Sequence, residues 1–185
     1  MKKTFVILML FFVSISYAQL YRSEIILRRG DTINAIGRIA GNKFKYRLNA
    51  DSKSEKIHFH DIDKATIWYS DDVVASYKYV NVKEVNGFSF YVLRVIQSGK
   101  VDLYAYAFPH NKYTAVEKYG PYYVKRENSH YATLMRPKGG FNADYIKVAL
   151  PYLNDCKIFV DNVFKGKFEK KDLSGMIKFY NENCQ

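Results

Sequence analysis

The sequence predicts an α+β fold, in which an antiparallel β-rich sandwich or barrel-like body is followed by a small C-terminal helical segment. From Leu20 to Leu134, short runs of β-branched and aromatic residues alternate with polar ones, which is the period of half-buried strands. Beyond the turn-rich stretch Arg136–Gly140, apolar residues recur every third or fourth position, which is the period of helices. We therefore expect a body over 19–135 and helices over 141–185 that pack on it as one unit.

Residues 1–18 have the pattern of a cleavable signal peptide. Lys2 and Lys3 form a basic start, and residues 5–13 are an unbroken run of nine apolar residues. A membrane span needs ~20 such residues, so the run suits the shorter core of an export signal. Ser16-Tyr17-Ala18 fits the small-x-small pattern for cleavage before Gln19. No cysteine lies near that point to accept a lipid, so we expect a soluble periplasmic or extracellular protein that is not a lipoprotein and has no transmembrane segment after cleavage.

The strand-like runs follow one another at close spacing. In the clearest pair, Ile25–Arg29 and Thr32–Ile39 flank Gly30-Asp31, which can supply the positive φ of a tight hairpin. Phe88–Gln97 and Val101–Phe108 flank a short glycine-containing connection in the same way. The other runs are Phe44–Leu48, Ile57–His60, Ala65–Tyr69, Val73–Val80, Tyr122–Arg126 and Tyr131–Leu134. Many short strands without helices between them indicate an antiparallel sandwich or barrel rather than βαβ units.

Three apolar stripes define the helical segment. The first begins after a candidate N-cap at Asn142, and Pro151 predicts a break or kink at Leu150. The last begins at Asp172, whose carboxylate suits the positive end of a helix dipole. The stripes consist of Ala143, Ile146, Ala149 and Leu150, then Leu153, Cys156, Phe159, Val160 and Val163, then Leu173, Met176, Ile177 and Tyr180.

The two cysteines are expected to form a disulfide. Cys156 falls within the second stripe, and Cys184 continues the face of Ile177 and Tyr180 by one helical turn, so both thiols point to the packing side. In an exported protein with two cysteines, a structural disulfide is the default. It would close a loop of about 28 residues and tie down the C-terminal end. A redox pair is disfavoured because no CxxC spacing occurs.

No motif assigns a catalytic residue or a cofactor. The sequence contains no His-Glu-x-x-His, no Gly-x-Ser-x-Gly and no phosphate-binding glycine loop. His58 and His60 would share one face of a strand and are candidate metal ligands, but a zinc site needs three or four ligands and the sequence does not identify the others. A solvated strand edge is therefore favoured over a metal site. We expect neither metal nor cofactor, and a non-enzyme rather than an enzyme.

Seventeen tyrosines are a high number for 185 residues. Tyr77 and Tyr79, like Tyr104 and Tyr106, are spaced to lie on one side of a strand. Carbohydrate and peptide binders use tyrosines in this way, because the ring offers contact area at little entropic cost. Packing into a β core is the alternative, and the period of two favours it.

The mature chain is strongly basic. Removal of Lys2 and Lys3 leaves 27 Lys and Arg against 18 Asp and Glu, a formal charge of +9. Outside the cytoplasm this charge favours an anionic membrane surface or a polyanionic glycan over nucleic acid as a partner. The cations are scattered along the chain, for example at 43–47 and 170–171, which favours solvated faces over one dedicated patch.

Several short motifs together resemble a family of uncharacterised secreted proteins of Bacteroidota. They are Gly30-Asp31-Thr32-Ile33 with Gly37-x-Ile39, Asp61-Ile62, Gly99-Lys100-Val101-x-Leu103-Tyr104, Tyr122-Tyr123-Val124-Lys125, Asp155-Cys156, Lys171-Asp172-Leu173 and Tyr180-Asn181-x-x-Cys184. The resemblance covers most of the mature chain. It implies an exported protein with a β-rich body and a helical C-terminus, and it assigns no activity.

Taken together, these features predict an exported, non-catalytic binding or structural protein of the bacterial envelope or extracellular space. Its expected partner is an anionic envelope component, a glycan or a protein. A secreted hydrolase with dispersed catalytic residues is the alternative, since scattered catalytic groups leave no motif.

Overall fold

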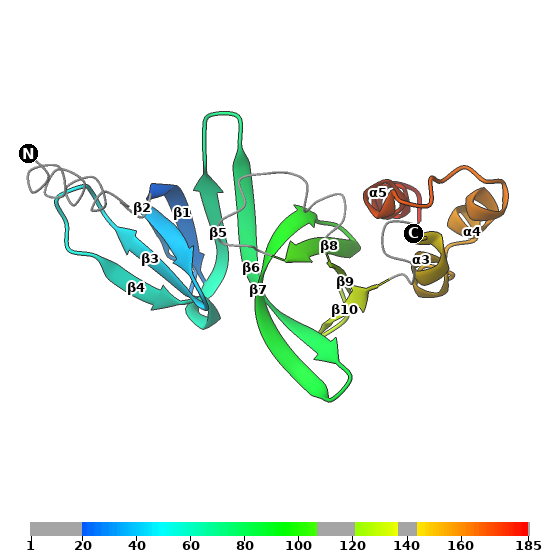
Figure 1. The fold of residues 1–185 in the computed structure, drawn as a ribbon, viewed down its shortest axis with the longest axis horizontal. Coiled ribbons are helices and arrows are strands. Elements are labelled where there is room, and N and C mark those ends of the chain that lie inside the picture. The colour runs from blue at the N-terminus through cyan, green and yellow to red at the C-terminus, as the bar shows by residue number, and fades with distance from the viewer. Residues whose placement is uncertain (1–19, 107–120, 137–143, 185) are drawn as a thin grey trace, which may run out of the picture.

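A computed structural model describes residues 20–106, 121–136 and 144–184. The predicted α+β fold with a β-rich body is confirmed (Figure 1). The strands are β1 (Tyr21–Leu27), β2 (Thr32–Ala40), β3 (Lys43–Arg47), β4 (Glu55–His58), β5 (Ile62–Trp68), β6 (Val74–Glu84), β7 (Gly87–Gln97), β8 (Val101–Tyr106), β9 (Tyr122–Arg126) and β10 (Ala132–Met135). The helices are the short 3-10 turn η1 (Phe59–Asp61) and α3 (Ile146–Tyr152), α4 (Lys157–Phe164) and α5 (Leu173–Asn183).

The strands form one continuous sheet in the order β4-β3-β2-β1-β5-β6-β7-β8-β9-β10, with antiparallel neighbours throughout. β10 also pairs in parallel with β6, through Ala132 with Val82 and Thr133 with Lys83. This additional pairing closes β6–β10 into a five-stranded barrel. β1–β5 continue the same sheet beyond β6. We call this part the open sheet, because it does not close into a barrel; it lies on the far side from the helices (Figure 1).

Strand β6 belongs to two hydrophobic cores. Because side chains alternate along a strand, Ala75 and Tyr77 point into the core of the β1–β5 sheet, whereas Val80 and Val82 point into the barrel. All four side chains are buried. The open sheet and the barrel are therefore joined through one shared strand rather than through a linker.

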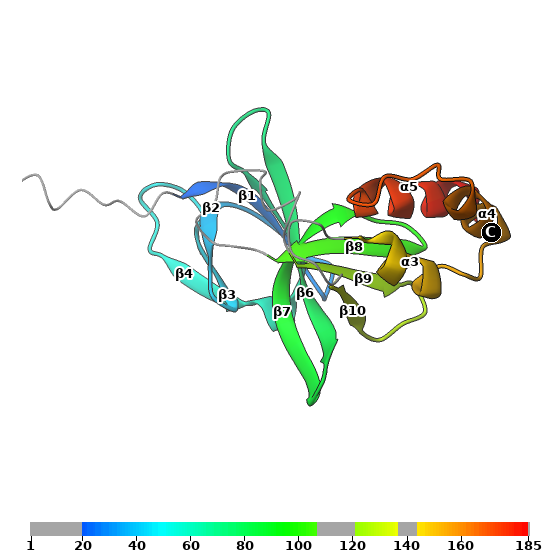
Figure 2. The same ribbon diagram turned by 45° about the vertical axis from the view of Figure 1, so that its right-hand side comes forward.

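The helices cover the outer surface of β8 and β9 (Figure 2). Leu103 and Val124 face the helices and are completely buried, while their neighbours Tyr104 and Tyr123 face the barrel interior. This third core explains why β8 is buried on both faces along most of its length. No helix in the described part of the chain is long and apolar enough to cross a membrane.

Two hairpins, β1–β2 and β6–β7, contain a glycine with positive φ at the turn. Gly30 has φ +99° in the β1–β2 turn, as the sequence predicts. The β6–β7 turn was not expected: β6 extends beyond Val80 to Glu84, which pairs with Gly87 at φ +137°. The two strands pair from Ser76 opposite Val95 to Glu84 opposite Gly87, and the ribbon they form projects past the barrel at the bottom of Figure 1.

The helical segment departs from the expected boundaries in one place. Of the predicted break or kink at Leu150, the break is wrong, because α3 continues through Pro151 to Tyr152. The buried side chains of Ala149 and Leu153 hold this turn against the barrel, and the Leu153 amide donates to the Ala149 carbonyl at 2.9 Å. Packing thus overrides the local preference of the residue before proline. The candidate cap Asn142 and residues 1–19 and 107–108 lie outside the described residues.

Candidate ligand-binding surfaces

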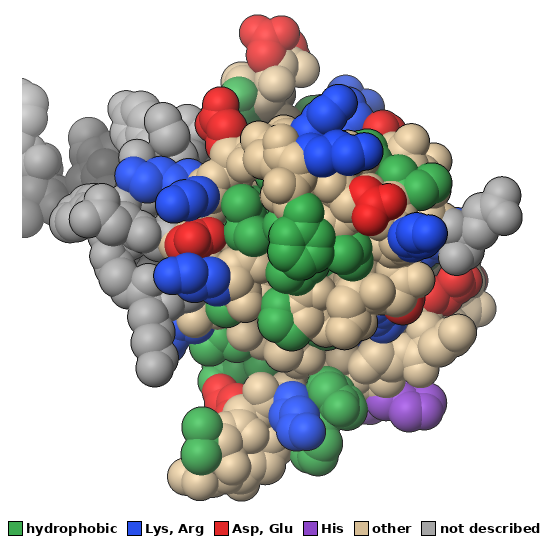
Figure 3. All heavy atoms as spheres, turned by 90° about the vertical axis from the view of Figure 1, so that its right-hand side faces the viewer, with side chains coloured by type: hydrophobic (Ala, Val, Ile, Leu, Met, Phe, Trp, Pro, Cys, Tyr) green, Lys and Arg blue, Asp and Glu red, His purple; other side chains and the backbone are tan. Residues whose placement is uncertain are grey.

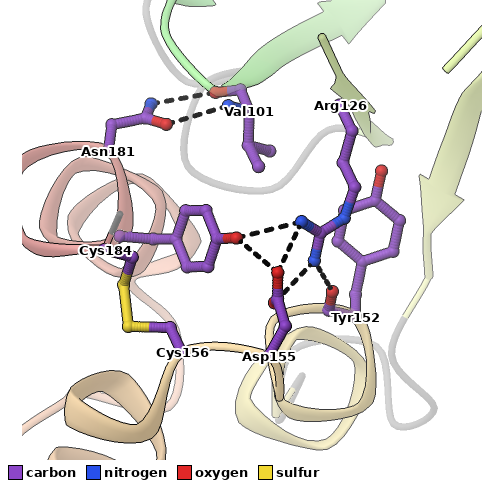
Figure 4. A network of polar contacts seen from close by, with 8 residues as sticks. Val101, Arg126, Tyr152, Asp155, Cys156, Asn181 and Cys184 are labelled. Atoms are coloured by element: carbon purple, nitrogen blue, oxygen red, sulfur yellow. Dashed lines mark hydrogen bonds and ion pairs between the residues drawn. A yellow bond between two sulfur atoms is a disulfide. The ribbon is translucent and has the colours of Figure 1, made fainter. Parts of the chain in front are cut away.

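A polar cluster lies between the barrel and the helices (Figure 4). The Arg126 guanidinium, on β9, donates to both carboxylate oxygens of Asp155 at 2.9 and 2.8 Å and to the Tyr180 hydroxyl oxygen at 2.9 Å. It also donates to the Tyr152 carbonyl at 2.5 Å and lies over the rings of Tyr152 and Tyr180. The Tyr180 hydroxyl in turn donates to Asp155. One arginine thereby joins β9 to three separate parts of the helical segment.

The electrostatics of this cluster favour its charged form. Hydrogen bonds from Arg126 hold the pKa of the Asp155 carboxyl below its ordinary value, and partial desolvation opposes this effect. Burial, together with the hydrogen bond to Asp155, raises the pKa of the Tyr180 hydroxyl. Each polar group therefore already has an internal partner, which is the arrangement of a structural joint rather than of a catalytic site.

Further contacts reinforce the same joint. The side-chain amide of Asn181 exchanges two hydrogen bonds with the backbone of Val101, both at 2.9 Å (Figure 4). Gln97 donates to the Ser174 hydroxyl at 2.6 Å. The structure brings Cys156 and Cys184 to disulfide distance, with 2.03 Å between the sulfurs, as the sequence predicts. The C-terminal helix is thus fixed to the barrel and to the start of α4.

The four candidate tyrosines do not form one site. Tyr77 and Tyr104 are 6% and 2% exposed, which is the packing alternative that the sequence favoured. Their hydroxyls bond to Tyr69 and Asp102, and burial raises the pKa of both. Tyr106 packs at the edge of the barrel core. Tyr79 is half-buried at the edge of the open-sheet core, where its ring contacts His58 and the exposed Phe90.

The two candidate histidines are not on one strand. His58 ends β4, whereas His60 lies in η1, where its backbone amide donates to Nδ1 of His58 at 3.0 Å. The prediction of a shared strand face is therefore wrong, because the chain turns inward at Phe59 to bury that ring in the core. Within the described residues, no group of three or more His, Cys, Asp or Glu is arranged to hold a metal ion.

Cations gather on the outer surface of β2, β3 and β4. Phe44 and Tyr46 point into the core, so the residues that alternate with them point outward. We call this surface the basic face; it consists of Arg38, Lys43, Lys45, Arg47 and Lys56. Pairing places Arg38 opposite Lys45, and Lys45 opposite Lys56. Three cations therefore lie side by side across three strands, with neighbouring strands ~5 Å apart.

Among the described residues, no carboxylate forms an ion pair with this row. The ion pairs between described residues are Arg29–Asp31, Arg126–Asp155, Lys147–Asp144 and Lys178–Glu182, and none includes a residue of the basic face. The Nε atoms of Arg38 and Arg47 have no hydrogen-bond partner. Like charges directly opposite each other destabilise a sheet. This arrangement of cations therefore lowers the stability of the fold and favours the binding of an anion.

A second exposed surface follows the β6–β7 ribbon. Phe88 and Phe90 are 59% and 52% exposed. Phe90 stacks on Tyr79 with 5.1 Å between ring centroids, and Phe88 contacts the Tyr131 ring at 5.4 Å. Lys83 lies at the same end as Phe88, with its ammonium group 5.4 Å from the centre of the Tyr131 ring. We call Tyr79, Phe88, Phe90 and Tyr131 the aromatic strip.

A third apolar surface lies at the helical end of the molecule. Ile158 and Phe164 on α4 are 55% and 79% exposed. Figure 3 shows hydrophobic side chains gathered at this end, with acidic and basic side chains around them. The mixed signs around this patch distinguish it from the basic face, where cations follow one another without a carboxylate between them.

The functional assignment rests on the surfaces described above, because comparison with known proteins provides none. The chain matches no family model, no curated protein and no solved structure at a significant level.

Proposed function

We propose that this protein is an exported, non-catalytic binding protein of the bacterial envelope or extracellular space, which holds an anionic polymer on the basic face. The row Arg38–Lys45–Lys56 carries the proposal, because three directly paired cations that form no ion pair with a described carboxylate match a ligand with repeated negative groups. The signal-like N-terminus and the cysteine pair at disulfide distance support export.

The shape of the surface supports a polymer over a single small anion. Lys43 and Arg47 extend the row along β3 on both sides of Lys45. On β1, Arg22 continues the surface and lies 5.0 Å from the centre of the Trp68 ring. A sheet face with cations over several strands offers many weak contacts instead of one enclosed pocket, and such contacts add up along a chain of charges.

The test compares two double variants of equal charge. Lys45→Gln with Lys56→Gln removes two cations from the basic face, and Lys165→Gln with Lys167→Gln removes two exposed cations from the helical end. We expect the first to weaken binding to polygalacturonate and to inorganic polyphosphate at least tenfold, and the second to change it less than twofold. Equal effects of the two double variants would show non-specific attraction to net charge and would overturn the proposal.

Salt provides an independent check. Binding through exposed cations must weaken as ionic strength rises, because the screening length falls from about 10 Å at 0.1 M salt to about 3 Å at 1 M. Binding of either polymer that is unchanged over this range would contradict a role for the basic face.

A further inference from the structure

We infer that the anionic polymer is an acidic polysaccharide whose sugar rings lie on the aromatic strip while its acidic groups contact the basic face. This inference rests on the proposed function and adds the class of ligand. It depends on two observations: the strip exposes the rings of Phe88 and Phe90, and it meets the basic face at His58.

The register of the ribbon places the strip on one face. Tyr79 is opposite Val92, Asn81 is opposite Phe90, and Lys83 is opposite Phe88. These side chains alternate with Val80 and Val82, which fill the barrel, so they all point away from the barrel interior. The planes of Tyr79 and Phe90 are only 24° apart. Phe90 thus stacks on the half-buried Tyr79 and remains 52% exposed itself, so its ring can pack against the apolar face of a sugar.

His58 connects the two surfaces. In register it lies opposite Lys43 of the basic face, and its ring is 5.7 Å from the ring of Tyr79. At the far end of the strip, Lys83 supplies another cation. A chain that crosses the strip therefore has positive charge at both ends of its path. This arrangement, with rings between two groups of cations, corresponds to a sugar polymer that carries acidic groups.

The tip of the ribbon argues against an anionic membrane as the occupant. Val85 is fully exposed there, but Glu84 and Asn86 flank it. Glu84 accepts hydrogen bonds from Ser89 and Tyr91. A carboxylate beside a single aliphatic side chain disfavours insertion into a negatively charged bilayer.

The experiment uses the mature chain and four probes: polygalacturonate, inorganic polyphosphate, uncharged dextran and vesicles of phosphatidylglycerol. Phe88→Ser with Phe90→Ser removes two exposed rings of the strip. Phe164→Ser, which removes an exposed ring from the helical end, is the matched control. We expect the strip variant to weaken polygalacturonate binding roughly tenfold and to leave polyphosphate binding within twofold, and we expect the control to change neither. Dextran should bind weakly or not at all.

The outcomes distinguish failure of this inference from failure of the proposed function. Unchanged polygalacturonate binding in the strip variant overturns this inference, as does tighter binding to the vesicles than to the polysaccharide. Unchanged polyphosphate binding in Lys45→Gln with Lys56→Gln overturns the proposed function itself. If the serine variant fails to fold, Phe88→Leu with Phe90→Leu retains apolar area and removes only the rings. Wild-type polygalacturonate affinity in that variant would also overturn the inference.

Discussion

At the residue scale, Lys45 has the least favourable position in the sheet. It lies between Arg38 and Lys56 on the two neighbouring strands, and like charges in such pairs repel each other. Residues that serve a binding site commonly lower the stability of the fold that carries them. Stability and binding should therefore respond in opposite directions to a change at this position.

We predict that Lys45→Glu stabilises the protein and abolishes polyanion binding. The new carboxylate would face a cation on each side, and two favourable cross-strand pairs should raise the free energy of unfolding by about 0.5–1 kcal/mol. Urea unfolding monitored by circular dichroism measures the first effect, and polyphosphate binding measures the second. A variant less stable than the wild type would show that the row is not repulsive in the folded protein.

The basic face could be predicted only in part. The alternation Lys43-Lys45-Arg47 is visible in the sequence and indicates one outward strand face. Arg38 and Lys56 are distant in sequence and reach Lys45 only through the turn at Gly41 and the connection over 48–54. Their register depends on turn geometry that composition does not reveal, so the cations were expected to be scattered.

At the scale of elements, the joint between barrel and helices depends on Arg126 and Asp155. The lowered pKa of Asp155 means that its ionised form is favoured in the folded protein. Its contribution to stability is therefore fully present above the ordinary pKa of 3.8 and is lost as the pH falls through the lower, folded-state value.

We predict that Asp155→Asn makes the protein less sensitive to acid. The Asp155 side chain is 52% exposed, so solvent screening limits the pair to about 0.5–1 kcal/mol. Between pH 6 and about pH 2.5, the wild type should lose this much more unfolding free energy than the variant, because only the wild type loses the charge on residue 155. Parallel urea titrations at several pH values measure the difference. Identical acid profiles would refute a role for this pair.

We also predict that reduction of Cys156–Cys184 loosens the helical segment. The bond closes a loop with a sequence separation of 28, and the chain-entropy model gives a stabilisation of roughly 3.5 kcal/mol for a loop of this size. Urea unfolding with and without a phosphine reductant measures the loss, and Cys156→Ala with Cys184→Ala should reproduce it. Equal midpoints in both conditions, or two free thiols in the native protein by mass spectrometry, would contradict the prediction.

The sequence predicted the helical elements better than the contacts between them. The cysteine count and the apolar stripes were enough to pair Cys156 with Cys184. The partnership of Arg126 and Asp155 has no such signal, because the two residues are 29 positions apart and each is one of many charged residues. Gln97 and Asn181 were missed for the same reason: polar side chains that satisfy a distant backbone follow no sequence period.

At the scale of the whole molecule, β6 couples the open sheet to the barrel. Tyr77 and Val82 lie in different cores but on the same strand. The two cores cannot separate unless this strand loses its packing on one face. We therefore expect a single cooperative transition.

Trp68 makes this expectation measurable. It is the one tryptophan of the chain, and it lies on β5 in the open sheet. Val82→Ala removes buried volume from the barrel and should cost roughly 1–3 kcal/mol. We predict that the Trp68 fluorescence midpoint in urea falls together with the circular dichroism midpoint. A Trp68 midpoint that stays unchanged while the barrel unfolds earlier would show two independent units.

The sequence identified the ten strand regions of the part of the chain that the structure describes, but not how the sheet closes. Alternating patterns located runs such as Tyr122–Arg126 at their observed bounds. A sandwich and a barrel share these patterns, and the choice depends on the pairing of Ala132 with Val82, 50 positions apart. The extension of β6 to Glu84 was missed although Val80 and Val82 still alternate with polar residues, and only Glu84 departs from the alternation.

The pairing of β10 with β6 also determines the order in which the chain can fold. Most strand contacts join close neighbours in the sequence, and such contacts form early because little chain entropy is lost. During synthesis from the N-terminus, the open sheet and the β6–β7 ribbon have all their residues before β10 exists. Until β10 arrives, the part of β6 beyond Tyr77, where β5 no longer pairs with it, remains an unpaired edge on one side and is exposed to pairing with other chains. The few residues of β10 thus protect the growing chain against aggregation as well as completing the barrel.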